Sequence, residues 1–513
     1  MSSTSRPRGV SRRAFIQAGA FGAGAATLAQ SPATAAPRAH TARPNILFLM
    51  SDQHRGDCVG ADGNAAIHTP NMDRLAREGA LFRCAYSTTP TCTPARAALL
   101  TGMNPWNHGM LGYSKVPEQY PVEMPRVLRD AGYHTLAVGK MHWSPQRGGH
   151  GFHNLILDEA SREDSPEFRS DYRAWFASEA PNLEVRATGI SSNSYRAAPY
   201  ALPEALHPTH WTGEVARRFI ETYERPEPFF LKVSFVRPHS PWDPPKRWMD
   251  FYQDKKLPAA HVGKWAERYR PRSDDSENIW HGDLGADQVR HSRQGYYGSV
   301  SHVDEEIGRV LEALEARGML ENTLILYTSD HGDMTGDHHL WRKSYAYEAS
   351  ARIPMIVRWP EGMVDAPRGQ TLRVPVEIRD ILPTFAEAAG AAIEHPIDGR
   401  SLIDAIRGAD DWRPWIDLEH DICYGERNHW SGLTDGRIKY IFHAFDGEEQ
   451  LFDLEKDPGE IHDLAGDPAH ADTLHTWRER LIAHLEHRGE EWVKDGKLAL
   501  RPQSILKSPN YPV

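Results

Sequence analysis

One short segment of the sequence places a cysteine and an arginine at the predicted start of a helix. It reads Cys92-Thr93-Pro94-Ala95-Arg96. Thr93 is a typical N-cap, Pro94 suits the first helical position, and Gly102 is a typical C-terminal stop. Cys92 is therefore expected just before a helix N-terminus, where free N–H groups favour an anion and lower the pKa of a thiol. With Arg96 on the same face, this pattern suits a nucleophile that acts on an anionic group, although an inert buried cysteine is the commoner interpretation of such a turn.

A second group of residues has the chemistry of a cation site. Asp52 and Gln53 follow the apolar run 45–50, and Asp330 and His331 end the run that begins at 323. Two carboxylates and two neutral donors form a plausible site for a hard divalent cation. A polar turn is the alternative for Asp330-His331 alone.

The third group is cationic and contains Lys140, His142, His239 and Lys343. The chain carries a formal net charge of −11, so an anionic substrate would need a local cationic pocket to attract it. Each of these residues alone would more often be solvated or structural. Together at strand ends they are expected to focus positive charge on one cleft.

The elements that must position these groups alternate along the chain. Besides 45–50, buried-strand patterns occupy 134–140, 228–239, 323–331 and 353–359, and helical patterns occupy 70–79, 94–101, 123–132, 210–224, 286–318 and 379–389. This alternation predicts an α/β fold with a mostly parallel sheet that helices cover on both faces. Because ligands bind beyond the carboxyl ends of such strands, Asp52, Lys140 and Asp330 are expected at one edge of the sheet.

The remaining segments predict long loops and a smaller second domain. Residues 145–208 and 240–285 are rich in Pro, Trp and charge and weakly periodic, which is typical of functional loops or lids. Short strands at 430–433, 438–443 and 450–454 and a helix at 468–487 indicate a small α+β domain. We assign 43–405 to a catalytic domain and 406–513 to this C-terminal subdomain. The distal end of a substrate site could be lined by His420, Glu426, Arg427, His429 and Trp430, and satisfied surface residues are the alternative.

The N-terminal residues 1–36 are typical of an export signal. Arg12-Arg13 precedes a weakly apolar stretch, and Ala33-Thr34-Ala35 resembles a cleavage site. The pair of arginines indicates a twin-arginine (Tat) signal peptide, with the Tat export machinery as a partner and a periplasmic or secreted location. The four cysteines are spaced irregularly, and folding before export makes a disulfide framework improbable.

The composition also excludes some classes of function. Among 513 residues, 25% are charged and 40% hydrophobic, which excludes a polytopic membrane protein and a long disordered chain. No run of Lys and Arg provides a footprint for nucleic acid. The apolar part of the leader is too short to span a bilayer stably, so an integral membrane protein is not expected.

The order of these motifs resembles the formylglycine-dependent (type I) sulfatases of the alkaline phosphatase-like superfamily. The Cys-x-Pro-x-Arg motif followed by a helix and Thr-Gly carries the resemblance. Further segments support it, at 45–52, 69–76, 139–142, 238–241, 329–333, 343–354 and 451–460. It covers nearly the whole chain after the leader, and implies the alkaline phosphatase-like fold.

The resemblance implies a role for each site residue. Cys92 would be oxidised to formylglycine by the formylglycine-generating enzyme, and the hydrated aldehyde would attack sulfur, with Arg96 as its stabilising partner. Lys140 and Lys343 would hold sulfate oxygens, His142 would contact the nucleophile, and His239 would protonate or polarise the leaving oxygen.

The same resemblance implies one divalent metal, whose ligands would be Asp52, Gln53, Asp330, His331 and the modified Cys92. The sequence departs here from the commonest family pattern, which has a second Asp at 53 and an Asn at 331. Calcium is predicted, while manganese, magnesium and zinc stay open because the ligand set has one charge fewer and an imidazole.

The predicted function is that of an exported sulfatase acting on sulfate esters of a carbohydrate, with aryl sulfates as surrogates. One alternative is a phosphonate monoester or phosphodiester hydrolase of the same superfamily, which Gln53 with His331 resembles somewhat more. The other is a catalytically silent carbohydrate-binding relative, against which the complete set of polar site residues argues.

Overall fold

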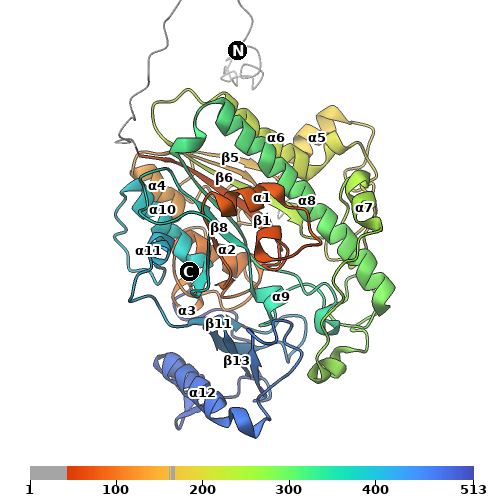
Figure 1. The fold of residues 1–513 in the computed structure, drawn as a ribbon, viewed down its shortest axis with the longest axis vertical. Helices are drawn as coiled ribbons and strands as arrows, with labels where there is room; N and C mark the ends of the chain where they lie inside the picture. Colours follow the sequence, from red (N-terminus) through yellow and green to blue (C-terminus); the bar gives the residue numbers. More distant parts are fainter. Residues whose placement is uncertain (1–42, 161, 163–167, 513) are drawn as a thin grey trace, which may run out of the picture. The chain divides into compact units, whose positions relative to one another are not determined.

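An eight-stranded sheet lies at the centre of the part of the chain that the computed structural model describes, residues 43–160, 162 and 168–512 (Figure 1). The strand order is β5(Asn154–Leu157), β4(His134–Gly139), β6(Phe229–Pro238), β1(Asn45–Asp52), β7(Thr323–Ser329), β8(Met355–Arg358), β2(Ala80–Phe82) and β9(Gln370–Leu372). Strands β5, β4, β6, β1 and β7 are parallel, whereas β8 is antiparallel to both of its neighbours. The mostly parallel sheet is therefore confirmed. The predicted signal peptide at 1–36 lies outside the described residues.

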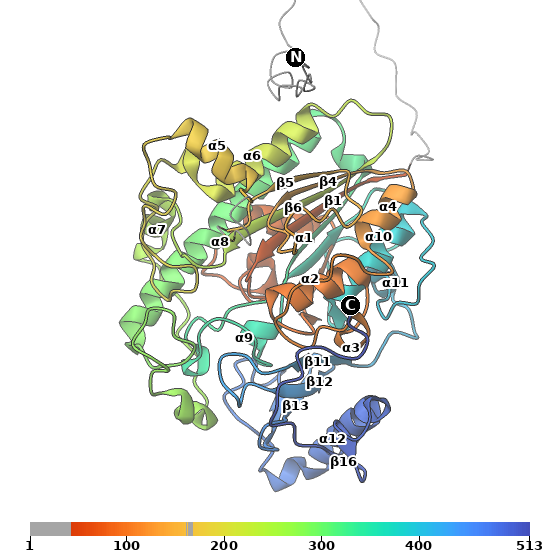
Figure 2. The same ribbon diagram turned by 180° about the vertical axis from the view of Figure 1, so that it is seen from behind.

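Helices cover both faces of this sheet, as the two opposite views show (Figures 1 and 2). Ile46, Phe48 and Met50 of β1 belong to the core shared with α2(Cys92–Thr101), α4(Met124–Asp130) and α10(Ile381–Ala389). Leu47 and Leu49 belong to the opposite core, shared with α1(Pro70–Arg77), α6(Pro208–Glu221) and α8(Gly285–Ala316). A strand covered on both faces has to be apolar at every position, which explains the unbroken apolar run of β1.

The two segments predicted as long loops contain regular elements. Strand β5 and helix α5(Asp171–Glu179) lie in the first, and α7(Lys246–Gln253) lies in the second. These elements are four, nine and eight residues long. They were not predicted, because segments this short show little periodicity. The consequence is large for β5, since it brings another strand end to the edge of the sheet.

The C-terminal part of the chain forms a four-stranded antiparallel sheet, with β11(Ile416–His420) followed by β12(Trp430–Thr434), β13(Ile438–His443) and β14(Glu449–Asp453). Strand β11 was not predicted, while the other three strands and helix α12(Ala471–Leu485) were. Lys439 of β13 is buried and its Nζ lies 2.8 Å from Glu348 and 2.9 Å from Glu460. This ion-pair network joins the small sheet to the segment that follows the predicted sulfate-binding Lys343.

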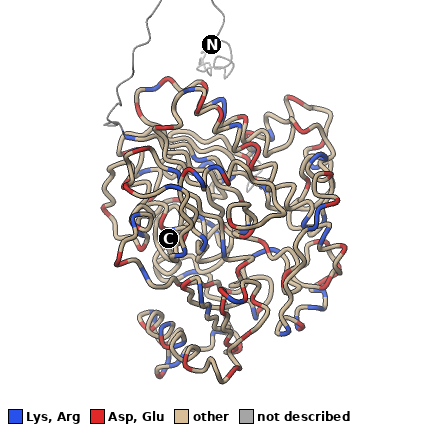
Figure 3. The backbone as a smooth tube through the Cα atoms, in the orientation of Figure 1, with Lys and Arg blue, Asp and Glu red and all other residues tan. Residues whose placement is uncertain are grey.

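Charges of both signs are distributed along the described chain, and Figure 3 shows Lys and Arg intermixed with Asp and Glu. No helix of the described residues has the length and apolar character needed to cross a membrane.

Candidate active site

The carboxyl ends of adjacent parallel strands bring most of the predicted site residues together. Asp52 ends β1, Lys140 follows β4, His239 follows β6 and Asp330 follows β7. Gly139 makes the turn after β4 possible: its φ is +91°, and a Cβ there would lie 2.1 Å from the carbonyl oxygen of Ser234. Only glycine accommodates both this backbone conformation and this close approach.

Cys92 is the first residue of α2, two positions further into the helix than predicted. Thr91, not Thr93, occupies the N-cap position, with an extended backbone and no side-chain capping bond. The Thr91 Oγ1 instead lies 2.6 Å from both Ser344 Oγ and His420 Nε2. The residue before the predicted nucleophile is thus held by tertiary hydrogen bonds, which local capping rules do not foresee.

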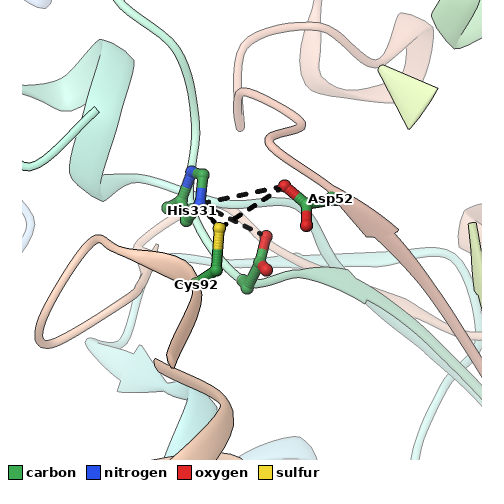
Figure 4. A group of neighbouring side chains, drawn as sticks. Asp52, Cys92 and His331 are labelled. Carbon is green, nitrogen blue, oxygen red and sulfur yellow. Dashed lines mark hydrogen bonds and ion pairs between the residues drawn. The ribbon is translucent and has the colours of Figure 1, made fainter. Parts of the chain in front are cut away.

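Four side chains converge on one point with the chemistry of a metal site. Figure 4 shows Asp52, Cys92 and His331 pointing toward one another. The Cys92 Sγ lies 3.1 Å from His331 Nε2 and 3.8 Å from Asp52 Oδ1, and His331 Nε2 lies 3.7 Å from Asp330 Oδ1. Their ligand atoms all lie within 4.8 Å of one another. The His331 Nδ1 lies 2.9 Å from the Gly332 carbonyl oxygen, and this bond turns Nε2 toward the group, so these residues fit a divalent cation.

Gln53 lies beside this group with both ends of its amide engaged. Its Oε1 accepts from Lys343 Nζ at 2.7 Å, and its Nε2 donates to Asp333. Its backbone N–H donates to Asp330 Oδ1 at 3.1 Å. In this arrangement Gln53 contacts the metal-binding group through Asp330, and its predicted role as a ligand stays a prediction.

Buried cations compensate the carboxylates. Arg96 is 1% exposed and lies 2.9 Å from Asp330 Oδ2 and 3.3 Å from Asp52 Oδ2. Lys140 also donates to Asp52, and its Nζ lies 3.8 Å from Cys92 Sγ. Burial alone would raise the pKa of Asp52, but Lys140 and Arg96 together hold it well below its usual range.

The cations also act on the cysteine. Burial and Asp52 favour the protonated thiol, but Lys140, Lys343 and His331 outweigh them and lower the pKa of Cys92 to about 7. The positive charges around the Cys92 sulfur therefore outweigh the negative ones, which favours an anion at this site.

His239 and Lys343 form a hydrogen-bonded pair. Lys343 Nζ lies 2.9 Å from His239 Nε2, and His239 Nδ1 lies 2.7 Å from the Ser240 carbonyl oxygen. Burial and Lys343 hold the pKa of His239 well below its usual range. The imidazole is therefore neutral at pH 7, donates through Nδ1, and accepts from the Lys343 ammonium through Nε2.

His142 lies at the same edge, held by a residue that the sequence did not single out. Its backbone N–H donates to Glu159 at 3.1 Å, and its Nε2 lies 3.4 Å from Tyr113 Oη. Among the described residues it makes no hydrogen bond to Cys92, so its contact with the nucleophile stays a prediction. Glu159 follows β5, and only recognition of that strand would have indicated it.

The polar residues near 420–430 divide into two sets. His420 is buried behind Thr91, and Trp430 is buried with its Nε1 donating to the Ser344 carbonyl oxygen at 3.0 Å. Glu426 and Arg427, by contrast, line a cavity. The distal-site role of Glu426 and Arg427 stays a prediction, whereas His420 and Trp430 are buried and bonded to residues beside Cys92 and Lys343.

Comparison with known proteins decides the family. A family model described as Sulfatase matches residues 44–391, more than half of the chain. The chain belongs to the sulfatase family. A second model, described as N-sulphoglucosamine sulphohydrolase, C-terminal, matches residues 336–487 of this sulfatase.

Three relatives illustrate how far the similarity extends. An arylsulfatase of Clostridium perfringens is 39% identical over 482 residues, covering 91% of this sulfatase and 99% of the relative. A choline-sulfatase of Rhizobium meliloti is 32% identical over 473 residues, covering 87% and 88%. The crystal structure of the phosphonate monoester hydrolase of Agrobacterium radiobacter has a TM-score of 0.72 and 26% identity, covering 90% of this chain and 100% of that one. The type I sulfatase resemblance and the alkaline phosphatase-like α/β fold are confirmed, and this sulfatase is a sulfuric ester hydrolase.

Proposed function

We propose that this sulfatase hydrolyses sulfate monoesters of a carbohydrate and that aryl sulfates serve as small surrogates. The observation that carries the proposal is the placement of Cys92 at the start of α2 among Lys140, Lys343 and His331. The preference for a carbohydrate is supported by a cavity of about 550 Å³, lined by Tyr269, Trp280 and Tyr345 among others. Its volume is typical of ligand sites. Tyr345 comes two residues after Lys343, which puts the aromatic wall close to the sulfate-binding residue in the chain.

The chain's own residues supply positioning and charge. Lys140, Arg96 and Lys343 bring positive charge to where the sulfate oxygens would lie, and removal of one such group is expected to cost about 3 kcal/mol of transition-state stabilisation. The Lys343 ammonium donates to His239 Nε2, so this pair carries a proton that it can pass to the leaving oxygen. The Ser240 carbonyl fixes the ring orientation that makes this possible.

Two groups absent from the unmodified chain complete the proposal. Asp52, Cys92, Asp330 and His331 would hold a divalent cation. We assign calcium because, with formylglycine in place of the Cys92 thiol, three of these four ligands would be oxygen donors. Formylglycine at Cys92 would supply a geminal diol nucleophile, and the cation would supply Lewis acidity beside it. Manganese, magnesium or zinc as the native ion is an outcome that elemental analysis of purified protein would reveal.

A mass measurement of the peptide across Cys92 tests the modification. Active protein is expected to carry formylglycine at Cys92, and Cys92→Ala is expected to lose nearly all activity while it keeps its fold. An unmodified thiol at full occupancy with undiminished turnover would contradict the proposal. The Tat signal at 1–36 is tested separately by replacing Arg12 and Arg13 with Lys and measuring export, which is expected to fail.

A phosphonate monoester or phosphodiester hydrolase is the second candidate, and the likeness to the Agrobacterium enzyme favours it. A panel of glucose 6-sulfate, 4-nitrophenyl sulfate and phenyl phosphonate esters separates the two. Our proposal requires kcat/KM to be higher for the sulfates. Efficient turnover of phosphonates alone would favour the second candidate.

A further inference from the structure

Asp158 is a buried carboxylate at the edge of the sheet that the reaction centre does not use. It follows β5 directly, and its backbone N–H donates to the Gly139 carbonyl oxygen at 3.1 Å. Gly139 precedes Lys140, so Asp158 lies at the strand end next to that of a sulfate-binding residue. The residue after it, Glu159, holds the backbone of His142.

One oxygen of this carboxylate lacks a partner among the described residues. Asp158 is 2% exposed, and its Oδ1 accepts from the Ala160 backbone N–H at 3.1 Å. Its Oδ2 is buried without a hydrogen bond. Burial raises the pKa of Asp158 to about 6, and the charges of Arg237 and Lys140 only partly oppose this shift. A buried carboxylate oxygen without a donor is costly, so its presence here requires an explanation.

Asp158 is one of the residues that line a cavity of about 160 Å³. Tyr172 and Tyr200 line this cavity, and both hydroxyls donate to the Leu206 carbonyl oxygen. Arg237 and Asp243 also line it and are paired with each other at 2.7 Å. These four polar side chains are thus engaged with protein, whereas Asp158 Oδ2 has no donor among the described residues.

The cavity shares its wall with the predicted leaving-group side of the reaction centre. Ser240 lines the cavity, and its carbonyl oxygen is the acceptor that orients His239. A substrate whose leaving oxygen lies at His239 and whose remainder enters this cavity would come within reach of Asp158.

We propose that Asp158 recognises a hydrogen-bond donor, a hydroxyl or an ammonium group, on the part of the substrate that bears the sulfate. This inference rests on the proposed function and names a specificity-determining residue for it. Asp158 binds and does not take part in the chemistry, so it distinguishes substrates that carry such a donor from those that do not.

Two variants at Asp158 and one at its neighbour test this assignment. Asp158→Leu removes the acceptor, Asp158→Asn keeps a neutral acceptor, and Glu159→Gln weakens the support of His142. Each variant is assayed on glucose 6-sulfate, on 2-aminoethyl sulfate and on 4-nitrophenyl sulfate, whose leaving group has no donor. Asp130→Asn, with a side chain 62% exposed on α4, is the matched surface control.

Asp158→Leu is expected to lower kcat/KM by about tenfold or more on a donor-bearing substrate and to leave 4-nitrophenyl sulfate within about twofold. If Asp158→Asn lowers kcat/KM on 2-aminoethyl sulfate as much as Asp158→Leu does, the donor is an ammonium group. If Asp158→Asn lowers kcat/KM less than Asp158→Leu does, and only on glucose 6-sulfate, the donor is a hydroxyl group. Glu159→Gln is expected to lower turnover of all three, and the melting temperature of Asp158→Asn is expected to be unchanged or raised.

Three results would overturn the inference. They are equal losses on all substrates with Asp158→Leu, no loss on any of them, and wild-type turnover of 4-nitrophenyl sulfate without turnover of either donor-bearing substrate. The last result leaves sulfate ester hydrolysis intact, whereas failure of the wild type on all three sulfates would contradict the proposed function itself.

Discussion

At the scale of single residues, the site is a balance of buried charges. Arg96 lies between the carboxylates of Asp52 and Asp330, and its NH1 also donates to the Lys140 carbonyl oxygen at 2.7 Å. One planar guanidinium thus fixes the relative positions of residues at three strand ends. A lysine ammonium has the same charge but cannot make these bonds in fixed directions.

We therefore expect Arg96→Lys to lower kcat/KM by about 10²- to 10³-fold, because the carboxylates and Lys140 would no longer be held in place. The measurement is steady-state kinetics on 4-nitrophenyl sulfate, together with the metal content of the purified variant. Arg218→Lys, at a side chain 72% exposed, should behave like the wild type. Near-normal activity of Arg96→Lys would show that its charge alone suffices.

At the scale of elements, the sheet edge depends on how each strand ends. Gly139 allows β4 to turn beneath Ser234 of β6, and a methyl group there would collide with a backbone carbonyl that cannot move aside. Gly390, which ends α10, has a similar left-handed φ of +62° but open space around it. Alanine substitutions at the two glycines therefore distinguish the cost of a left-handed backbone from the cost of a steric collision.

Gly139→Ala is expected to lower the free energy of unfolding by about 3 kcal/mol or more and to abolish activity. Gly390→Ala should cost about 1 kcal/mol, the strain of the left-handed conformation alone. Urea unfolding of both variants and of the wild type checks this difference. Equal costs would mean that the Ser234 carbonyl relaxes away.

The end of β11 supports the start of α2. Because His420 Nδ1 donates to the Asp421 carbonyl oxygen, its Nε2 accepts from Thr91, which in turn contacts Ser344. Ser344 also donates its backbone N–H to the Pro90 carbonyl oxygen at 2.9 Å. This chain of bonds ties the segments of Cys92 and Lys343 to the C-terminal sheet.

His420→Ala is expected to lower kcat by about tenfold with little change in KM, because it loosens the segments that carry Cys92 and Lys343 without touching substrate. His475→Ala, 68% exposed on α12, is the control. If His420 instead bound the distal end of the substrate, the variant would have a higher KM and an unchanged kcat. Measurement of both parameters therefore decides between these roles.

At the scale of the whole molecule, several buried histidines make stability depend on pH. Burial, reinforced by Arg379, lowers the pKa of His108 at the end of α3(Pro105–His108) to about 3. An unfolded histidine takes up a proton near pH 6.5, so the unfolded state gains stability as pH falls below that value. Buried acids act in the opposite direction, since burial raises the pKa of Asp304 to about 7. A variant comparison is therefore needed to isolate one histidine.

Between pH 7.5 and pH 5 the wild type is expected to lose about 2 kcal/mol more stability than His108→Asn, whose side chain cannot be protonated. The Asn side chain can still accept from the Met110 backbone N–H, as His108 Nδ1 does at 3.2 Å. Urea unfolding at the two pH values measures the difference. His462→Asn, at a side chain 76% exposed, should show no such effect, and parallel losses in wild type and His108→Asn would contradict the assignment.

The sequence by itself determined the sheet, its main helices and the strand ends that carry the site. Those features follow from patterns within one element: the apolar run before Asp52, and the proline and glycine that bound the helix after Cys92. The convergence of Asp52, Lys140 and Asp330 followed from one rule, that parallel strands share their carboxyl edge. The fold class and the core of the site were predictable for this reason.

Only the tertiary structure decided which side chains meet across the chain. It placed Thr91 against His420, directed the Gln53 amide to Asp333 and Lys343, and brought Asp158 to the sheet edge on a four-residue strand. Such contacts join residues up to 329 positions apart and leave no periodic signal in either segment. They depend on how the layers pack, because a side chain's partners are set by the neighbouring element and not by its own.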